Sequence, residues 1–314
     1  FGEGCHQCFV LAEIDHGVLA GVQAAQGTRG GFRTIGRRFD IVDDVLPEAR
    51  FQHDQATDDL LVPLDAVDAQ LLPAQQHRHI RCRLARHRQL VLESMVRSRI
   101  TGRNHAYLSN HELKVHLLAE YGSATLDIRE QFALLPWEET QFIATQLGIR
   151  HPFFPGTSTP TVLTTDLLVT LARPDGIELV AISAKLKKDL TPRNLEKLLL
   201  ERLYWNRRGI RWILATEDNI HAIRASNLMF FETALNDERA TQSGINPVEF
   251  SRRFEDHWAP SLSFNEIMNL TIESMSVDVH TGHALLGSAV WNRDSRIDID
   301  TKKLTHRDTV NFKL

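Results

Sequence analysis

The sequence predicts an α/β protein in which a mixed sheet flanked by helices is followed by a smaller helical unit. Two β-rich runs lie on either side of the turn-forming residues 174–176, which indicates a hairpin. A helical pattern and a further apolar run follow the hairpin, which indicates a crossover to a parallel strand. Three amphipathic patterns then occur after about residue 237.

Bulk composition fits a soluble globular protein of about two domains. The chain has 314 residues, of which 42% are hydrophobic and 24% charged. Three cysteines are too few for a disulfide scaffold, so a reducing, cytoplasmic location is expected. A net charge of −4 does not point to a nucleic-acid-binding protein, but it does not exclude one, because nucleic-acid binding depends on a local basic face rather than on the net charge.

Residues 1–94 show no sustained period and are left unassigned, as a non-native or disordered N-terminal extension with Met95 as a candidate start. Cys5 and Cys8 have the spacing of half a zinc site, and His77, His79 and Cys82 are candidate partners. Unrelated thiols are the commoner explanation, because a strong zinc signal needs two well-spaced pairs.

Residues 95–236 are predicted to form a catalytic domain. A Ser109-x-x-Glu112 capping box begins a helix that Gly122 ends. A strand over 125–132 follows, with Leu126, Ile128 and Glu130 on one face. The remaining expected elements are a helix over 137–147, strands over 161–171 and 178–186, a helix from Thr191 and Pro192 to Gly209, and a strand over 211–216.

Residues 237–314 are predicted to form a small winged-helix-like domain. The three helix candidates are 247–257, 263–274 and 280–291. Alternating Ile297 and Ile299 indicate a short strand or wing.

Two charged residues interrupt the apolar hairpin strands, and burial without partners would be costly. Centring the turn on residues 175 and 176 places Asp166 directly opposite Lys185, with Ser183 on the same face. A half-buried ion pair explains Asp166 and Lys185 equally well, and helix capping explains Glu112. Taken together, carboxylates near a lysine on a hairpin followed by a crossover helix indicate a metal-dependent phosphodiesterase.

Five segments, taken in order, resemble the motifs of TnsA endonucleases, and the resemblance extends over about residues 97–231. Residues 108–113 (LSNHEL) are similar to the family's LSDLE segment, and residues 125–136 (TLDIREQFALLP) to DIREQFPLLP. Residues 164–169 (TTDLLV) resemble STDFLV, residues 181–185 (AISAK) resemble AIQVK, and residues 195–205 (LEKLLLERLYW) resemble LEKLELERRYW.

The resemblance implies a restriction-endonuclease-like fold and a catalytic set of Glu112, Asp166, Ser183 and Lys185. It implies that Glu112, Asp166 and the main-chain oxygen of Ala184 hold Mg²⁺, with Mn²⁺ as a substitute. Ser183 departs from the family's glutamine and, being shorter, would support the metal or its water. Glu201 is a candidate supporting residue, although a salt bridge at the core edge is the commoner use.

The resemblance further implies a division of labour. A TnsA-like subunit cuts the 5′ strand at transposon ends, a DDE transposase acts on the other strand, and an AAA+ ATPase regulator docks on the C-terminal unit. The candidate DNA-binding residues are Lys187, Lys188, Arg207 and Arg208, for which a solvated helix face is the common alternative. Two rival functions are a catalytically silent assembly subunit, which Ser183 favours, and a stand-alone restriction or defence nuclease.

Overall fold

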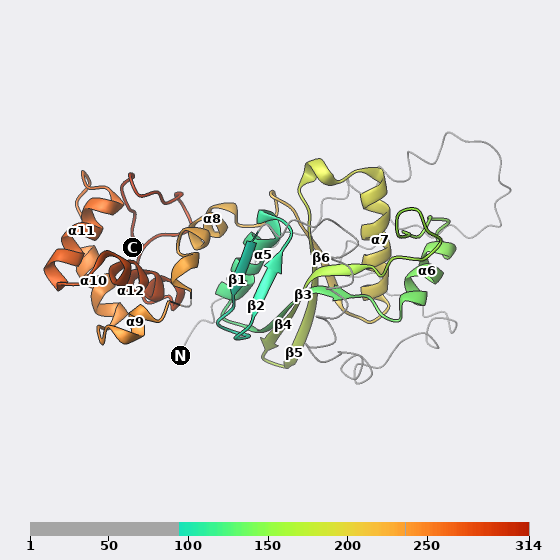
Figure 1. The fold of residues 1–314 in the computed structure, drawn as a ribbon, viewed down its shortest axis with the longest axis horizontal. Coiled ribbons are helices and arrows are strands. Elements are labelled where there is room, and N and C mark those ends of the chain that lie inside the picture. The colour runs from blue at the N-terminus through green and yellow to red at the C-terminus, as the bar shows by residue number, and fades with distance from the viewer. Residues whose placement is uncertain (1–93, 236, 314) are drawn as a thin grey trace.

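The computed structural model describes residues 94–235 and 237–313. A sheet with its flanking helices forms one side of the molecule, and the C-terminal helices form the other (Figure 1). The predictions for Cys5, Cys8 and the rest of the N-terminal 93 residues lie outside the described residues. None of the helices in the described ranges has the length and apolar character that a bilayer crossing requires.

A short hairpin and a buried helix begin the described chain. Strands β1 (Ser94–Arg97) and β2 (Asn104–Tyr107) pair antiparallel, an element that the sequence analysis did not anticipate. Helix α5 (Asn110–Tyr121) begins at Ser109, whose hydroxyl accepts from the Glu112 N–H, and ends at Gly122. The predicted capping box therefore fixes the start of α5, and with it the position of Glu112.

The central sheet has the order β3-β4-β5-β6 and is mixed, as predicted. Strands β3 (Thr125–Ala133), β4 (Thr164–Arg173) and β5 (Gly176–Ala184) pair antiparallel, and β6 (Arg211–Ala215) pairs parallel to β5. Helix α7 (Pro192–Asn206) makes the crossover between β5 and β6. The order strand, crossover helix, strand thus forms the predicted parallel pair.

The hairpin register differs from the predicted one by two residues. Arg173 pairs with Gly176, so only residues 174 and 175 lie in the loop, and the ladder ends at Leu167 and Ile182. The expected direct opposition of Asp166 and Lys185 is therefore wrong. Gly176 has a φ of 135°, a conformation that favours glycine and accommodates this tighter turn. A shift of two residues keeps the same faces of the strand, whereas a shift of one would have exchanged them.

Each face of the sheet contributes to a different apolar core. One core contains Ile128, Leu167 and Ile182 and is covered by α5. The other contains Leu168 and Ala181 and is covered by α7 and by α6 (Trp137–Gln146). The face prediction for Leu126 is wrong, because a register shift between Thr125 and Asp127 leaves Leu126 half exposed.

A cluster of buried polar side chains connects β2 and β3 to α5; we call it the histidine cluster and define it as His105, Tyr107, His116, Glu120 and Glu130. His105 Nδ1 lies 2.7 Å from Glu130 Oε2, and the Tyr107 hydroxyl lies 2.6 Å from His116 Nδ1. Both histidines and the tyrosine are fully buried. Burial, together with the charges of neighbouring groups, holds the pKa of His116 well below its ordinary value, so this ring stays neutral.

The C-terminal part is helical, and helices are observed at all three predicted places. Its elements are α8 (Ala222–Phe230), η2 (Glu232–Ala234), α9 (Arg239–Gln242), α10 (Pro247–Asp256), α11 (Phe264–Met275) and α12 (Val279–Trp291). Ile297 forms an isolated bridge with Phe312 rather than a strand. The apolar core on the α5 side continues through α8 into α10, α11 and α12. The winged-helix assignment and the boundary at residues 236 and 237 remain predictions.

Candidate active site

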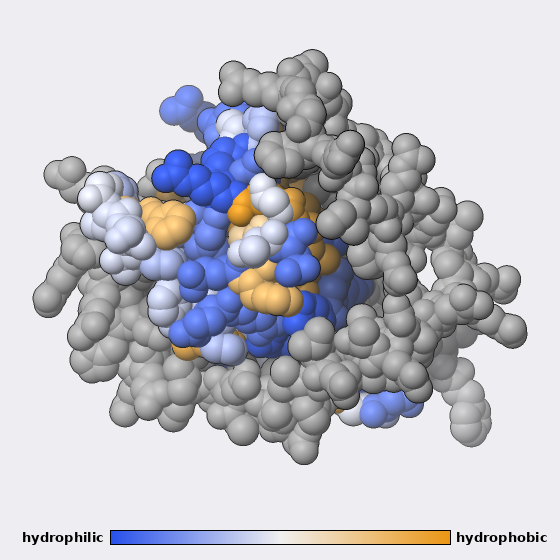
Figure 2. All heavy atoms as spheres, turned by 90° about the vertical axis from the view of Figure 1, so that its right-hand side faces the viewer, coloured by the Kyte–Doolittle hydropathy of each residue, from blue (hydrophilic) through white to orange (hydrophobic). Residues whose placement is uncertain are grey.

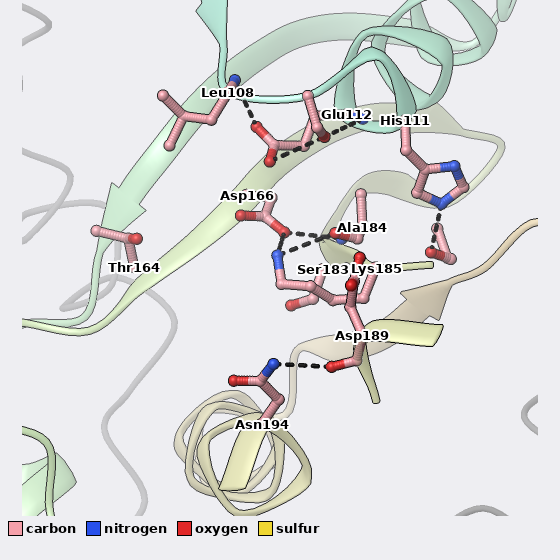
Figure 3. A network of polar contacts seen from close by, with 12 residues as sticks. Leu108, His111, Glu112, Thr164, Asp166, Ser183, Ala184, Lys185, Asp189 and Asn194 are labelled. Carbon is pink, nitrogen blue, oxygen red and sulfur yellow. Dashed lines mark hydrogen bonds and ion pairs between the residues drawn. The ribbon is translucent and has the colours of Figure 1, made fainter. Parts of the chain in front are cut away.

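Asp166 and Lys185 meet where β4 and β5 come together near the sheet end, despite the shifted register. Lys185 Nζ donates to Asp166 Oδ2 at 2.7 Å and to the Ala184 carbonyl at 2.9 Å. The Ala184 N–H also donates to Asp166 Oδ2, at 2.8 Å. Figure 3 shows Asp166 between this group and Glu112. The length of the lysine side chain thus makes up for the two-residue offset of the backbones.

Glu112 points from the first turn of α5 toward the same place (Figure 3). Its carboxylate accepts from the Leu108 N–H at 3.2 Å and from the Ser109 hydroxyl at 3.2 Å. The pKa of Glu112 is raised to about 7, mainly by burial and next by the negative charge of Asp166, while the charge of Lys185 opposes both. A capping glutamate therefore also belongs to a charged cluster, which capping alone does not require.

Lys185 carries a positive charge in this setting. Burial lowers the pKa of its ammonium, but the charge and hydrogen bond of Asp166, with the charges of Glu112 and Glu201, outweigh burial and raise it. The side chain is about one-third exposed, so solvent reaches it. Such a group can stabilise negative charge on a neighbouring ligand, but it is a poor proton acceptor.

Ser183 lies toward α7. Its hydroxyl donates to Glu201 and accepts from Trp212 Nε1 at 3.2 Å. Glu201 is buried, and burial followed by the charge of Asp166 raises its pKa to about 7. Among the described residues, Glu201 is held by hydrogen bonds from hydroxyls and an indole and forms no salt bridge, contrary to the favoured expectation.

Two further residues touch this site and were not singled out in the sequence. Gln131 Nε2 donates to Asp166 Oδ1 at 3.2 Å, and His111 Nε2 donates to the Ala215 carbonyl at 2.9 Å. That carbonyl also accepts from the Lys185 N–H at 3.0 Å. The pairing register of β3 and β4 would have placed Gln131 opposite Asp166. That register could not be predicted from the sequence, because no short turn joins the two strands. No local signal indicated the contact of His111.

Comparison with known proteins relates the segment that contains most of these residues to one family. Residues 122–217 match the family described as TnsA-like endonuclease N terminal. This segment is similar to the N-terminal domain of TnsA-like endonucleases. The transposition protein TnsA of transposon Tn7 from Escherichia coli is 40% identical over 139 residues, which are 44% of this chain and 50% of that protein. The chain thus spans about half the length of this relative.

The TnsA-like segment contains most of the predicted site, namely Asp166, Ser183, Ala184, Lys185 and Glu201. Glu112 lies ten residues before the matched segment begins. The restriction-endonuclease-like mixed sheet is confirmed by this match together with the observed strand order. The place of Glu112 therefore rests on the geometry, which brings it to Asp166.

The oxygen atoms that converge at this site are of the kind that hard divalent cations prefer. Within residues 94–235 and 237–313, no three side chains of His, Cys, Asp or Glu gather as a metal-binding group. Two carboxylates, from Glu112 and Asp166, do converge, and the Ala184 carbonyl adds a neutral oxygen. Lys185 Nζ donates to both Asp166 Oδ2 and that carbonyl, so these two oxygens face the same place.

The predicted DNA-binding residues differ in how available they are. Arg208 is buried, forms an ion pair with Glu139 at 2.7 Å and lies over the Tyr204 ring. Arg207 also contacts Glu139, at 3.3 Å. Lys187 pairs with Asp218, whereas Lys188 is exposed. Among the residues that Figure 2 colours, on the side of the molecule at the right of Figure 1, hydrophilic side chains predominate, with some apolar ones between them.

Proposed function

We propose that this chain is the endonuclease subunit of a heteromeric transposase and cuts the 5′ strand at transposon ends in a Mg²⁺-dependent reaction. The observation that carries the proposal is the meeting of Asp166, Lys185 and the Ala184 carbonyl at one sheet end, with Glu112 beside them. The TnsA-like match supports it, as does the name of the Tn7 relative, which is a transposition protein.

Glu112, Asp166 and the Ala184 carbonyl would hold Mg²⁺, and Mn²⁺ would substitute. A bound divalent ion supplies a low-pKa water and neutralises charge on the scissile phosphate. The raised pKa of Glu112 fits this role, because burial and, after it, the nearby carboxylate of Asp166 both disfavour its charged form. A cation bound there would favour the ionised form of both.

Other residues of the chain would have supporting roles in the reaction. Lys185, kept protonated by Asp166, would stabilise negative charge on the attacked phosphate. Ser183 would act through Glu201, to which its hydroxyl donates, rather than as a ligand. Glu201, whose pKa of about 7 allows it to gain or lose a proton near neutrality, would support the site from α7.

We also propose the partners that the resemblance implies: transposon-end DNA, a DDE transposase and an AAA+ ATPase regulator. The helices α9 to α12 would form the docking element for the regulator. On the catalytic side, Lys188 is the best of the predicted phosphate-contacting residues, since Arg207 and Arg208 are engaged with Glu139.

A strand-specific nicking assay tests the proposal. With the partner transposase, labelled transposon-end DNA and Mg²⁺, Asp166→Asn and Lys185→Ala should each slow 5′-strand cutting by roughly 10²–10³-fold or more, while complex assembly is kept. Asp175→Asn, in the exposed hairpin loop, is the matched control and should cut normally.

The rival functions give different results in the same assay. Assembly with no cutting by the wild-type chain identifies a silent assembly subunit, the alternative that Ser183 favours. Efficient cutting without any partner identifies a stand-alone nuclease. Cutting at the wild-type rate by Asp166→Asn would remove the proposed site altogether.

A further inference from the structure

Gln131 adopts a backbone conformation that is unusual for its place in the chain. Its φ is 49°, in the left-handed region, although it lies inside β3. The other non-glycine residues with positive φ in the described ranges, Ser276 and Arg293, lie where helices end. Left-handed residues inside strands are uncommon, and such outliers gather at functional sites.

This conformation changes the faces that β3 presents. Glu130 contacts His105 in the histidine cluster on the α5 side, whereas Phe132, two residues later, packs on Trp205 in the core on the α7 side. Two residues of a regular strand that lie two positions apart share a face. Gln131, between them, is therefore the point where the strand turns over.

The neighbouring strand turns over at the same level. Leu167, which pairs with Glu130, lies in the α5-side core. Thr165, which pairs with Phe132, instead accepts a hydrogen bond from Trp205 Nε1 at 2.6 Å, on the α7 side. Asp166 lies between these two, so it occupies the position opposite Gln131 where both strands reverse.

The Gln131 side chain is held in one orientation by its neighbours. The Thr164 hydroxyl donates to Gln131 Oε1 at 3.1 Å, which turns the amide nitrogen toward Asp166. Gln131 Nε2 donates to Asp166 Oδ1 at 3.2 Å, while Asp166 Oδ2 accepts from the Ala184 N–H and from Lys185. Both oxygens of the carboxylate are therefore restrained, one of them by Gln131 alone among the described hydrogen-bond donors.

We propose that Gln131 is a positioning residue that fixes the rotation of the Asp166 carboxylate, and that its left-handed backbone exists to aim the amide. The proposal rests on the nuclease function given above. Partners that orient metal-binding side chains commonly affect metal affinity or activity by about 10–100-fold. Without the amide, Asp166 would retain its contacts to Ala184 and Lys185 but lose the restraint on its other oxygen.

Glycine and alanine at this position separate the amide from the backbone. Glycine adopts positive φ freely, so Gln131→Gly removes the amide without straining the strand, whereas Gln131→Ala keeps the unfavourable conformation. We expect both variants to bind Mn²⁺ about 10–100-fold more weakly than the wild type. Binding is measured in titrations of the purified full chain, from the loss of the electron paramagnetic resonance signal of free Mn²⁺. Both variants lose the hydrogen bonds of the amide, but only glycine relieves the left-handed conformation that the wild type already has, so the thermal midpoint should be lower for Gln131→Ala than for Gln131→Gly.

Gln146→Ala is the matched control, because Gln146 is an exposed glutamine on α6. It should leave Mn²⁺ binding and the thermal midpoint unchanged. If Gln131→Gly binds Mn²⁺ as tightly as the wild type, Gln131 serves only the backbone and the positioning role is overturned.

Asp166→Asn distinguishes failure of this inference from failure of the proposed function. In one outcome, Asp166→Asn binds Mn²⁺ weakly and does not cut, while Gln131→Gly binds Mn²⁺ and cuts DNA as the wild type does. In that case only the positioning role of Gln131 fails. If Asp166→Asn binds Mn²⁺ and cuts normally, the site itself is misassigned and both proposals fail. Both proposals are supported if Asp166→Asn and Gln131→Gly each bind Mn²⁺ weakly and cut the 5′ strand slowly, and if the thermal midpoint of Gln131→Gly lies above that of Gln131→Ala.

Discussion

Helix α5 borders two groups of ionisable side chains that are satisfied in different ways. In the histidine cluster, Glu120 accepts from the Ser98 hydroxyl at 2.7 Å and from the Arg99 N–H at 2.7 Å, and Glu130 lies against His105. The histidine cluster is closed to solvent. At the start of the same helix, Glu112 faces Asp166 and the partly exposed Lys185.

The difference indicates which group is built for stability and which for chemistry. The histidine cluster pairs its acids with internal donors and joins β2 and β3 to α5, as a structural network does. The group of Glu112, Asp166 and Lys185 has two carboxylates for one ammonium, and the pKa of Glu112 is raised by burial and, after it, by the charge of Asp166. An incompletely compensated, solvent-reachable acidic group is typical of a site that receives a cation.

The largest expected effect tests the structural half of this comparison. Glu130→Ala would leave buried His105 without its acidic partner, so the free energy of unfolding should fall by about 3–5 kcal/mol. Chemical denaturation measures it. Glu138→Ala, at an exposed site on α6, is the control and should change stability little. A loss below about 1 kcal/mol for Glu130→Ala would show that the histidine cluster is not structural.

The next effect tests the chemical half through pH. The proposed metal binding would require ionised Glu112, whose pKa is raised from 4.5 to about 7. Mn²⁺ affinity should therefore fall about tenfold for each pH unit below about 7, measured by calorimetry. Glu112→Gln should bind more weakly and show a flatter pH profile, and Glu138→Gln should match the wild type. An unchanged profile in Glu112→Gln would exclude Glu112 as a ligand.

The same shift of Glu112 has a consequence for stability without metal. The folded chain holds a proton on Glu112 between pH 4.5 and about 7 that the unfolded chain has lost. The free energy of unfolding should therefore decrease as pH rises through this window and level off above it. Glu112→Gln should reduce that decrease, and the residual slope should reflect Glu201, whose pKa is also raised to about 7.

A smaller effect concerns the α7 side of the site. Ser183→Ala removes the hydroxyl that donates to buried Glu201, so we expect a loss of about 1–3 kcal/mol in the free energy of unfolding. Ser274→Ala, at an exposed helical serine, is the matched control. If Ser183→Ala cuts no DNA while remaining stable, Ser183 acts in catalysis directly rather than through Glu201.

The smallest effect concerns DNA association. Lys188→Ala should weaken binding to transposon-end DNA uniformly across sequences and reduce the slope of affinity against salt by about one. Arg208→Ala should instead lower the thermal midpoint, because Arg208 is buried against Glu139. If Arg208→Ala altered the slope of affinity against salt and Lys188→Ala did not, Arg208 rather than Lys188 would be the phosphate-contacting residue. Fluorescence anisotropy at several salt concentrations measures both.

Much of the fold was predictable because its signals are local. The Ser109 cap, Pro192 at the start of α7 and the turn after Arg173 each depend on neighbouring residues, and all lie where expected. The hairpin of β1 and β2 was missed because its strands are only four residues each. The register error at Gly176 arose because loop length, which no periodic pattern reveals, sets the pairing.

The sequence by itself determined the elements, their order and the residue types at the site, since these follow from local backbone preferences and from motif resemblance. Only the tertiary structure decided which side chains meet. Gln131 reaches Asp166 because two strands separated by a helix and a long loop turn over at the same level. Ser183 faces Glu201 because α7 crosses that face of the sheet. Contacts between distant segments depend on packing of the whole sheet, which no short stretch of sequence specifies.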